Sequence, residues 1–289
     1  MAHNSDSSIV NIDIANLQGG EATGEFYLSR SGLKDAAGYQ GKYFTLNGIM
    51  MIICRDDSGG TVTIDGKAYS LKKGSVAILP ENHILRLGED SDLSEDGVLA
   101  VTMDFILDMP SPIDTNIFIY SRFSPVLSVS EEKLSDLWSY FDFIGKELLE
   151  SGRHRQAIIK ALIYALLLEI TAEYEDRFHL GETREIKSEN LPDKFFRLLA
   201  ANFRSQRSVS WYAGQLNLTP KYLSTAVKGI TGRPVLDWIH EAVVIEAKML
   251  LKTTDRTVQE ISDHLGFSSA SAFVQFFRKH NGTTPGAIR

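Results

Sequence analysis

The fold is decided by a helical pattern that is written twice, and its second copy reads Glu260-Ile-Ser-Asp-His-Leu-Gly-Phe267, Ser268-Ser-Ala-Ser-Ala-Phe-Val-Gln-Phe-Phe-Arg278, then Gly282. The first copy reads Trp211-Tyr-Ala-Gly-Gln-Leu-Asn-Leu218, Thr219-Pro-Lys-Tyr-Leu-Ser-Thr-Ala-Val-Lys228, then Gly232. The copies differ by one residue inserted at the turn. Each predicts a short helix, a tight turn and a second helix, the arrangement of a helix-turn-helix motif.

The second helix of each copy separates an apolar face from a polar one. Apolar residues that recur at helical spacing are expected to pack: Leu223, Val227 and Ile230 in the first copy, and Phe273, Phe276 and Phe277 in the second. In such motifs this helix enters the major groove of DNA. Hydrogen-bond donors on the other face are the candidate DNA-binding residues: Lys221, Ser224, Thr225, Lys228, Ser271, Gln275, Arg278 and Lys279.

The chemistry of these side chains suggests their roles. Gln275 can bond bidentately to adenine, Lys221 can donate to guanine, and the hydroxyl residues of the set can reach several base edges. Lys228, Arg278 and Lys279 lie farther along their helices and are better placed for phosphates. Any one of these residues is equally well explained as part of a solvated helix face. The repeat of the whole arrangement favours DNA contact.

A single helix is predicted between the copies, from Pro234 to Leu251, with an apolar stripe. The stripe consists of Leu236, Ile239, Val243, Ala247 and Leu250. At 1.5 Å per residue the helix spans about 27 Å. Successive major-groove faces are about 34 Å apart, so this connector and the motif bodies can place both second helices on one side of the duplex.

Charge is distributed unevenly along the 289 residues, whose net charge is −7. Residues 194–289 hold 13 Lys and Arg against 6 Asp and Glu, which is +7, so residues 1–193 carry −14. A basic module joined to an acidic one indicates a polyanionic partner for the C-terminal part alone. The single cysteine, Cys54, excludes an internal disulfide framework and suits a reducing cytoplasm. Neither a secretory signal nor a membrane span is predicted.

Short β-strands are predicted in the N-terminal part, after an arm or first strand in residues 1–20. The expected strands are Tyr43–Cys54, Thr61–Ile64, Lys67–Leu71, Ser75–Leu79 and Val98–Phe105. Asp65-Gly66 suits a type I′ hairpin loop, which needs positive φ at both central residues. Strands at this spacing predict a sandwich or a small barrel. Their order, with Leu71-Lys-Lys-Gly74 and Pro80-Glu-Asn-His83, resembles a cupin-like sensor barrel over residues 20–110.

An enzymatic cupin would hold a metal with a cluster of His and Glu. Here His83 is the only histidine between His3 and His154, so three histidines cannot gather inside the barrel. The chain also has no GxSxG, Walker loop, GxGxxG or HExxH motif. No metal, cofactor or catalytic residue is therefore predicted, and the chain is not expected to be an enzyme.

Helical spacing continues over residues 131–180. One stripe contains Leu134, Leu137, Trp138, Phe141, Ile144 and Leu148, and a second contains Ile158, Ile159, Leu162, Ile163, Leu166, Leu167 and Ile170. These helices either cover the barrel or form a dimer contact. The polar run Glu173–Asn190 predicts a linker or helix end, closed by Pro192. The expected domains are a sensor barrel with its arm (1–130), a dimerisation segment (131–180), a linker (181–193) and a DNA-binding domain (194–289).

The C-terminal residues are similar to the signature of the AraC/XylS-type transcription regulators. The resemblance rests on Ile261-Ser-Asp-His-Leu-Gly-Phe267, Phe273-Val-Gln-Phe-Phe-Arg-Lys279 and Gly282-Thr-Thr-Pro285, and covers residues 194–289. It implies two helix-turn-helix units joined by a linker helix, an upstream sensor and dimerisation domain, and promoter binding that activates transcription. Val243 departs from the pattern, because the family usually carries an arginine there.

These observations predict an α+β, two-domain chain: an N-terminal cupin-like β-barrel with covering helices, and an all-α DNA-binding domain. The predicted function is a cytoplasmic, sequence-specific DNA-binding regulator that is dimeric and recruits or positions RNA polymerase. A small-molecule effector would bind in the barrel. Two alternatives stay open: an N-terminal domain that binds only a protein partner or itself, and a cupin-type enzyme fused to a DNA-binding module.

Overall fold

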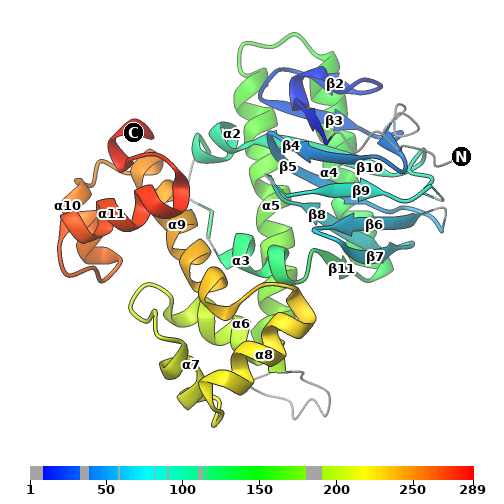
Figure 1. The fold of residues 1–289 in the computed structure, drawn as a ribbon. Helices are drawn as coiled ribbons and strands as arrows, with labels where there is room; N and C mark the ends of the chain where they lie inside the picture. Colours follow the sequence, from blue (N-terminus) through cyan, green and yellow to red (C-terminus); the bar gives the residue numbers. More distant parts are fainter. Residues whose placement is uncertain are drawn as a thin grey trace, which may run out of the picture. The chain divides into compact units, whose positions relative to one another are not determined.

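The computed structural model describes residues 9–32, 39–57, 59–81, 83–89, 91–109, 113–114, 116–179 and 191–289. The chain forms two compact units (Figure 1). A β-sheet unit contains Met1–Ser111 and Ser124–Ile170, and a helical unit contains Pro112–Phe123 and Thr171–Arg289. The predicted α+β, two-domain class is thereby confirmed.

Two sheets make up the β-sheet unit. The five-stranded sheet has the order β1 (Val10–Ile12), β4 (Tyr43–Leu46), β9 (Leu85–Leu87), β6 (Gly60–Ile64) and β7 (Lys67–Leu71). The six-stranded sheet has the order β11 (Val126–Ser128), β8 (Ser75–Leu79), β5 (Gly48–Ile53), β10 (Gly97–Thr102), β3 (Phe26–Ser29) and β2 (Glu21–Ala22). Val62 and Leu85 of the first sheet share one buried cluster with Ile52 and Val98 of the second. The core of this unit therefore lies between the sheets.

The predicted closed barrel is wrong. Closure requires a ladder that joins the edge strands of the two sheets, and none does so in the described part of the chain. The edge strands of the six-stranded sheet, β11 and β2, are three and two residues long and offer few groups for such a ladder. The sheets are instead held by their shared apolar side chains, which is the sandwich alternative.

One predicted strand, Tyr43–Cys54, is split between the two sheets. The chain leaves β4 at Leu46 and enters β5 at Gly48, where an added Cβ would lie 2.3 Å from the carbonyl oxygen of Val101. Glycine is needed at this close approach of two backbones, so the continuous apolar run conceals a break.

Two other β-strand predictions can be compared with the structure. The Asp65-Gly66 loop joins β6 to β7 and has the positive φ angles expected, 48° and 82°. The predicted strand Val98–Phe105 ends early at Thr102, whose side chain accepts a hydrogen bond from the Phe105 N–H at 3.2 Å. It thereby caps helix α2 (Met103–Leu107).

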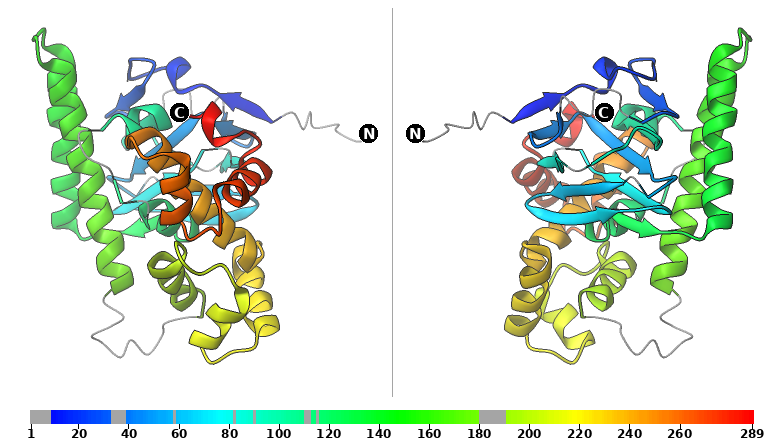
Figure 2. Two further views of the ribbon diagram at one scale, coloured as in Figure 1. Left: turned by 90° about the vertical axis from the view of Figure 1, so that its left-hand side faces the viewer. Right: turned by 90° about the vertical axis from the view of Figure 1, so that its right-hand side faces the viewer.

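Two long helices follow the sheets, as the apolar stripes predict, and lie side by side in both views of Figure 2. Helix α4 (Glu131–Leu149) packs on the six-stranded sheet, where Trp138 and Phe141 close over Gly97. Helix α5 (Arg155–His179) is tied to α4 by Lys133 Nζ and Glu169 Oε2, 2.6 Å apart. Because α5 continues to His179, the polar run Glu173–Asn190 begins as a helix end; residues 180–190, which hold most of the predicted linker 181–193, lie outside the described residues.

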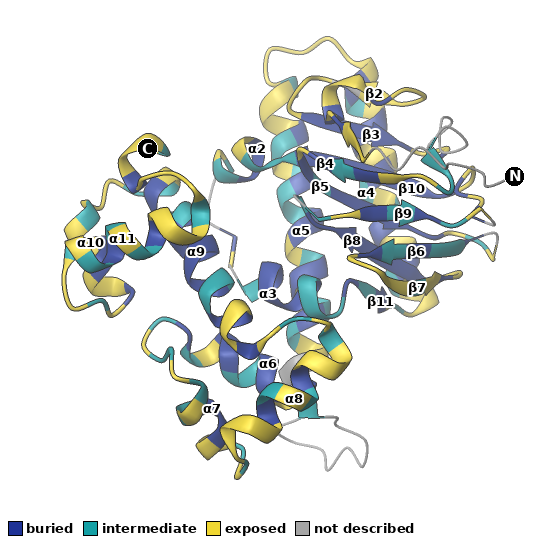
Figure 3. Ribbon diagram, viewed as in Figure 1, coloured by how far each residue is buried: buried dark blue, intermediate teal, exposed yellow. Residues whose placement is uncertain are grey.

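The helical unit contains most of the C-terminal part of the chain. Its helices are α3 (Asn116–Phe123), α6 (Leu191–Asn202), α7 (Val209–Gln215), α8 (Pro220–Thr231), α9 (Val235–Thr253), α10 (Val258–His264) and α11 (Ala270–Asn281), followed by a 3-10 turn (Pro285–Ala287). Pro192, predicted to close the domain boundary, lies in the first turn of α6, where proline is tolerated. Figure 3 shows that α9 is mostly buried, whereas α8 carries exposed residues along its length.

Candidate nucleic-acid interface

Helices α7 and α8 form the first helix-turn-helix motif. Asn217 turns the chain with φ of 55°, and the Thr219 hydroxyl accepts from the Tyr222 N–H at 3.2 Å to cap α8. The helix ends at Gly232, whose φ is 78°. Leu223 and Val227 are fully buried, as predicted. Ile230, predicted to pack with them, is 47% exposed, because it lies in the last turn of α8.

Helices α10 and α11 form the second motif. The side chain of Thr257 accepts from the Glu260 N–H and the Glu260 carboxylate accepts from the Thr257 N–H, a reciprocal cap that fixes the start of α10. Gly266 makes the turn with φ of 66°. Phe273 and Phe277 are fully buried, whereas Phe276 is partly buried and packs against the ring of Phe267 at 5.2 Å.

All eight candidate DNA-binding residues lie on α8 or α11. Seven are exposed: Lys221, Thr225, Lys228, Ser271, Gln275, Arg278 and Lys279. Ser224 is half-buried, and the Thr225 hydroxyl donates to the Lys221 carbonyl oxygen at 2.9 Å. That bond leaves the Thr225 oxygen and methyl group available, so the residue is suited to accept from a base or to contact a thymine methyl.

The exposed faces of α8 and α11 carry positive charge and no negative charge. Helices α8 and α11 contain no acidic residue in their sequences, so their basic side chains are not offset within the helix. Burial, followed by the charge of a neighbouring side chain, lowers the pKa of His240 and of His280, whose rings lie 4.3 Å apart. Both are therefore neutral at pH 7, and the positive charge of these faces comes from lysine and arginine.

A buried carboxylate that the sequence analysis did not identify joins the second motif to the segment that precedes the first motif. Glu246 of α9 is 6% exposed and accepts from Arg204 at 2.8 and 3.2 Å. The ring of His264, at the end of α10, lies 3.4 Å from the same carboxylate. Glu246 falls at helical spacing with Ile239 and Val243. An acidic residue within an apolar stripe was therefore the sequence signal that could have identified this buried carboxylate. Val243 itself is fully buried.

Arg207, which also precedes the first motif, forms a second connection to the second motif. Its guanidinium donates to the carbonyl oxygens of Leu265 and Gly266, and lies over the Phe267 ring at 3.7 Å. The two carbonyl oxygens and the Phe267 ring lie at the turn of the second motif, and Arg207 lies before α7. The connector α9 and these polar contacts therefore tie the second motif to the segment before α7.

A protein-family model described as a helix-turn-helix domain matches residues 212–289. The chain is 22% identical over 243 residues to the arabinose operon regulatory protein of Salmonella typhimurium, covering 80% of this chain and 79% of that protein. The C-terminal module belongs to the helix-turn-helix domains of the AraC type. These similarities agree with the predicted DNA-binding transcriptional regulator.

Other similarities cover the C-terminal module. An uncharacterised HTH-type transcriptional regulator of Bacillus subtilis, YtdP, is 28% identical over 100 residues, which are 35% of this chain and 13% of that protein. A crystal structure of the DNA-binding domain of AdpA in complex with a target DNA is 27% identical, with a TM-score of 0.32 over 35% of this chain and 89% of that one.

The described residues also bear on two other classes of function. No described helix is both long and apolar enough to cross a membrane. Within the same residues, no three His, Cys, Asp or Glu side chains gather closely enough to hold a metal ion. His83, the one histidine predicted inside the N-terminal domain, lies 2.5 Å from Asp65 at the hairpin loop.

Proposed function

We propose that this chain binds promoter DNA sequence-specifically by placing α8 and α11 in successive segments of the major groove. The observation that carries the proposal is the division of both helices into a buried apolar face and an exposed face of donors. Four lysine and arginine residues lie on these exposed faces with no acidic neighbour in either helix. The 19 residues of α9 separate the motifs by about 28 Å at 1.5 Å per residue.

Gln275→Ala is expected to remove base discrimination. Gln275 is exposed near the middle of α11, and a bidentate glutamine–adenine pair contributes about 1–3 kcal/mol of discrimination. Binding selection from randomised DNA should therefore show one position losing its preference while the others keep theirs. Gln259→Ala is the matched control, because Gln259 is exposed on α10, outside the reading helices. An unchanged profile for Gln275→Ala would refute the assigned face.

Lys228→Ala should weaken binding to every sequence by a similar factor. Lys228 lies near the C-terminal end of α8, where a phosphate contact positions the protein without reading bases. Removing one phosphate contact should lower the slope of log affinity against log salt by about 1. Titration of specific and unrelated duplexes at several salt concentrations measures this slope. Lys42→Ala, an exposed lysine of the β-sheet unit, should leave it unchanged.

The upstream residues are proposed to control this binding in the cytoplasm. We assign residues 1–130 to a sensor domain, 131–180 to dimerisation, 181–193 to a linker and 194–289 to DNA binding. Support for a homodimer comes from exposed apolar side chains on α4 and α5: Phe143 is 61%, Leu149 78% and Ile158 42% exposed. An operon regulator among the relatives supports action on transcription, which we expect to be activation through RNA polymerase.

A small-molecule effector and a protein partner remain the two candidates for the sensor. Thermal-shift screening separates them, because a ligand that binds only the folded protein raises its melting temperature with concentration. A small molecule that does so and changes DNA affinity would identify the effector. Repeating the melting of the full chain at several protein concentrations tests self-association, because a dimer melts at a higher temperature when the protein is more concentrated.

A further inference from the structure

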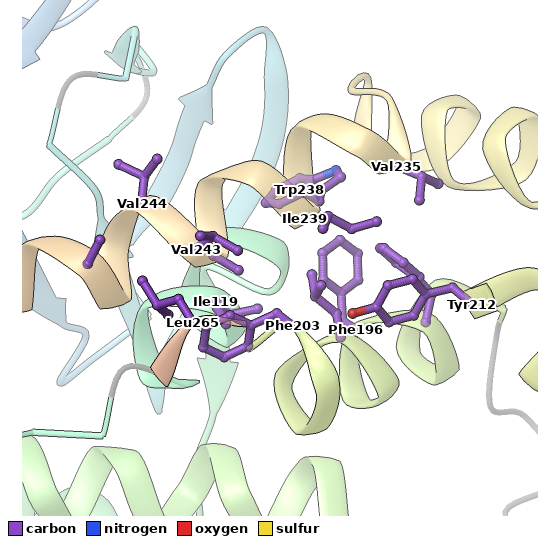
Figure 4. Close-up of a cluster of buried hydrophobic side chains, with 14 of the residues drawn as sticks. Ile119, Phe196, Phe203, Tyr212, Val235, Trp238, Ile239, Val243, Val244 and Leu265 are labelled. Carbon is purple, nitrogen blue, oxygen red and sulfur yellow. The ribbon is translucent and has the colours of Figure 1, made fainter. Parts of the chain in front are cut away.

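Helix α3 lies outside the DNA-binding module in sequence but within its core in space. It is encoded between α2 and β11, two elements of the β-sheet unit, yet residues Pro112–Phe123 belong to the helical unit. Ile119 is 3% exposed and is part of the cluster that contains Phe196 and Trp238, as Figure 4 shows. The hydrophobic core of the DNA-binding module therefore includes a helix from far upstream.

A chain of aromatic contacts leads from α3 to the end of the first reading helix. Phe123 stacks on Phe196 with ring centroids 3.9 Å apart, and Phe196 meets the ring of Trp238 edge-on at 4.8 Å. The indole Nε1–H of Trp238 donates to the Thr231 hydroxyl at 3.2 Å. Thr231 is the last residue of α8, so packing of α3 reaches the C-terminal end of that helix.

An ionic connection runs beside the aromatic one. Arg122 of α3 pairs with Glu241 of α9, and the same carboxylate accepts from Arg233 Nη1 at 2.6 Å. The side chains of Arg122 and Glu241 are only 14% and 17% exposed, so water screens this pair less than a surface pair. Arg233 directly follows the Gly232 cap of α8, and its guanidinium lies over Trp238 at 4.6 Å.

We propose that Arg122 is a positioning residue for the first reading helix, acting through Glu241 and Arg233 on the C-terminal end of α8. The inference rests on the proposed role of α8 in reading DNA, and it adds a route for regulation. Because α3 is continuous in the chain with α2 and β11, a change in the β-sheet unit that pulls on either element is transmitted to α8. The connection ends at Arg233, directly after α8.

The test uses the full-length chain and randomised DNA. It compares base preferences at the positions read by α8 with those at the positions read by α11, here called the two half-sites. Lys221→Ala defines the positions read by α8, and Gln275→Ala those read by α11. Arg122→Met should reduce preference at the α8 positions by about two- to thirtyfold, with the α11 positions unchanged. Arg122→Lys keeps the charge and should restore much of the loss. Arg86→Met removes the cation of an ion pair in the β-sheet unit, with Glu89, and should change neither half-site.

A double-variant comparison tests the route itself. If Arg122 acts through Glu241, Arg122→Met and Glu241→Gln together should lose little more preference than either alone. Equal loss at both half-sites would show a general effect on folding and overturn the proposal, as would an Arg122→Met profile identical to wild type. If wild type shows no base preference at all, the proposed function fails instead. Melting temperatures of the variants identify any that do not fold, and if Arg122→Met is one of them, Glu241→Gln carries the comparison, because it removes the carboxylate that holds both Arg122 and Arg233.

Discussion

Phe196→Ala is expected to lower the free energy of unfolding of the helical unit by about 3–5 kcal/mol. Phe196 is fully buried and its ring contacts three other aromatic rings: those of Phe123, Phe195 and Trp238, at 3.9, 5.0 and 4.8 Å. These rings come from different elements, so the cavity cannot be closed by moving one side chain. The resulting loss combines the transfer free energy of the ring with the cost of the cavity.

Denaturant unfolding followed by circular dichroism measures this loss. Helices α6 to α11 of this unit lose their helical signal when the unit unfolds. Tyr222→Ala is the control, because Tyr222 is an aromatic residue of the same unit that is 58% exposed. It should change stability by less than about 0.5 kcal/mol. A loss below about 1 kcal/mol for Phe196→Ala would contradict the central position assigned to this ring.

Asp96→Asn should remove a pH dependence of stability from the β-sheet unit. Asp96 is fully buried, and burial raises the pKa of its carboxyl from 3.8 to about 6; the Arg55 N–H, which donates to Oδ1 at 3.0 Å, opposes this only in part. The folded state therefore holds this proton more tightly than the unfolded state does. Stability from this group is fully present below pH 3.8 and is lost as the pH rises to about 6.

The expected size of the effect follows from the shift of the pKa. About two pKa units correspond to about 3 kcal/mol, so wild type should lose about that much relative to Asp96→Asn between pH 4 and pH 7. Urea unfolding at a series of pH values measures the difference. Glu131→Gln is the control, because a hydrogen bond from Lys73 lowers the pKa of Glu131 and gives the opposite sign. Parallel curves for wild type and Asp96→Asn would contradict the prediction.

Local sequence patterns predicted elements that are long or that have marked ends. The stripes of α4 and α5, the Asp65-Gly66 hairpin and both helix-turn-helix motifs are of this kind. The short strands β3, β9 and β11 have only three or four residues each, too few for a periodic signal. Their existence depends on partners elsewhere in the sheet, such as the pairing of β3 with β10.

The residues of the candidate interface could be predicted from the sequence, whereas the buried polar contacts that support it could not. Helical spacing alone placed eight candidates on two helices, because residues three or four apart share one face. It did not identify Arg204, Arg207 or Glu246, whose contacts join different helices. It also misplaced Ile230, since spacing cannot tell whether a partner covers the last turn of a helix.

The sequence by itself determined the double helix-turn-helix motif, its family and the division of charge between the two parts of the chain. These features depend on residues close together in sequence. Only the tertiary structure decided that the sheets stay open and that α3 lies in the core of the DNA-binding module. Arg122 and Glu241 are 119 residues apart, and no local pattern encodes such a pair. It forms because packing of Ile119 and Phe123 brings the two charges together.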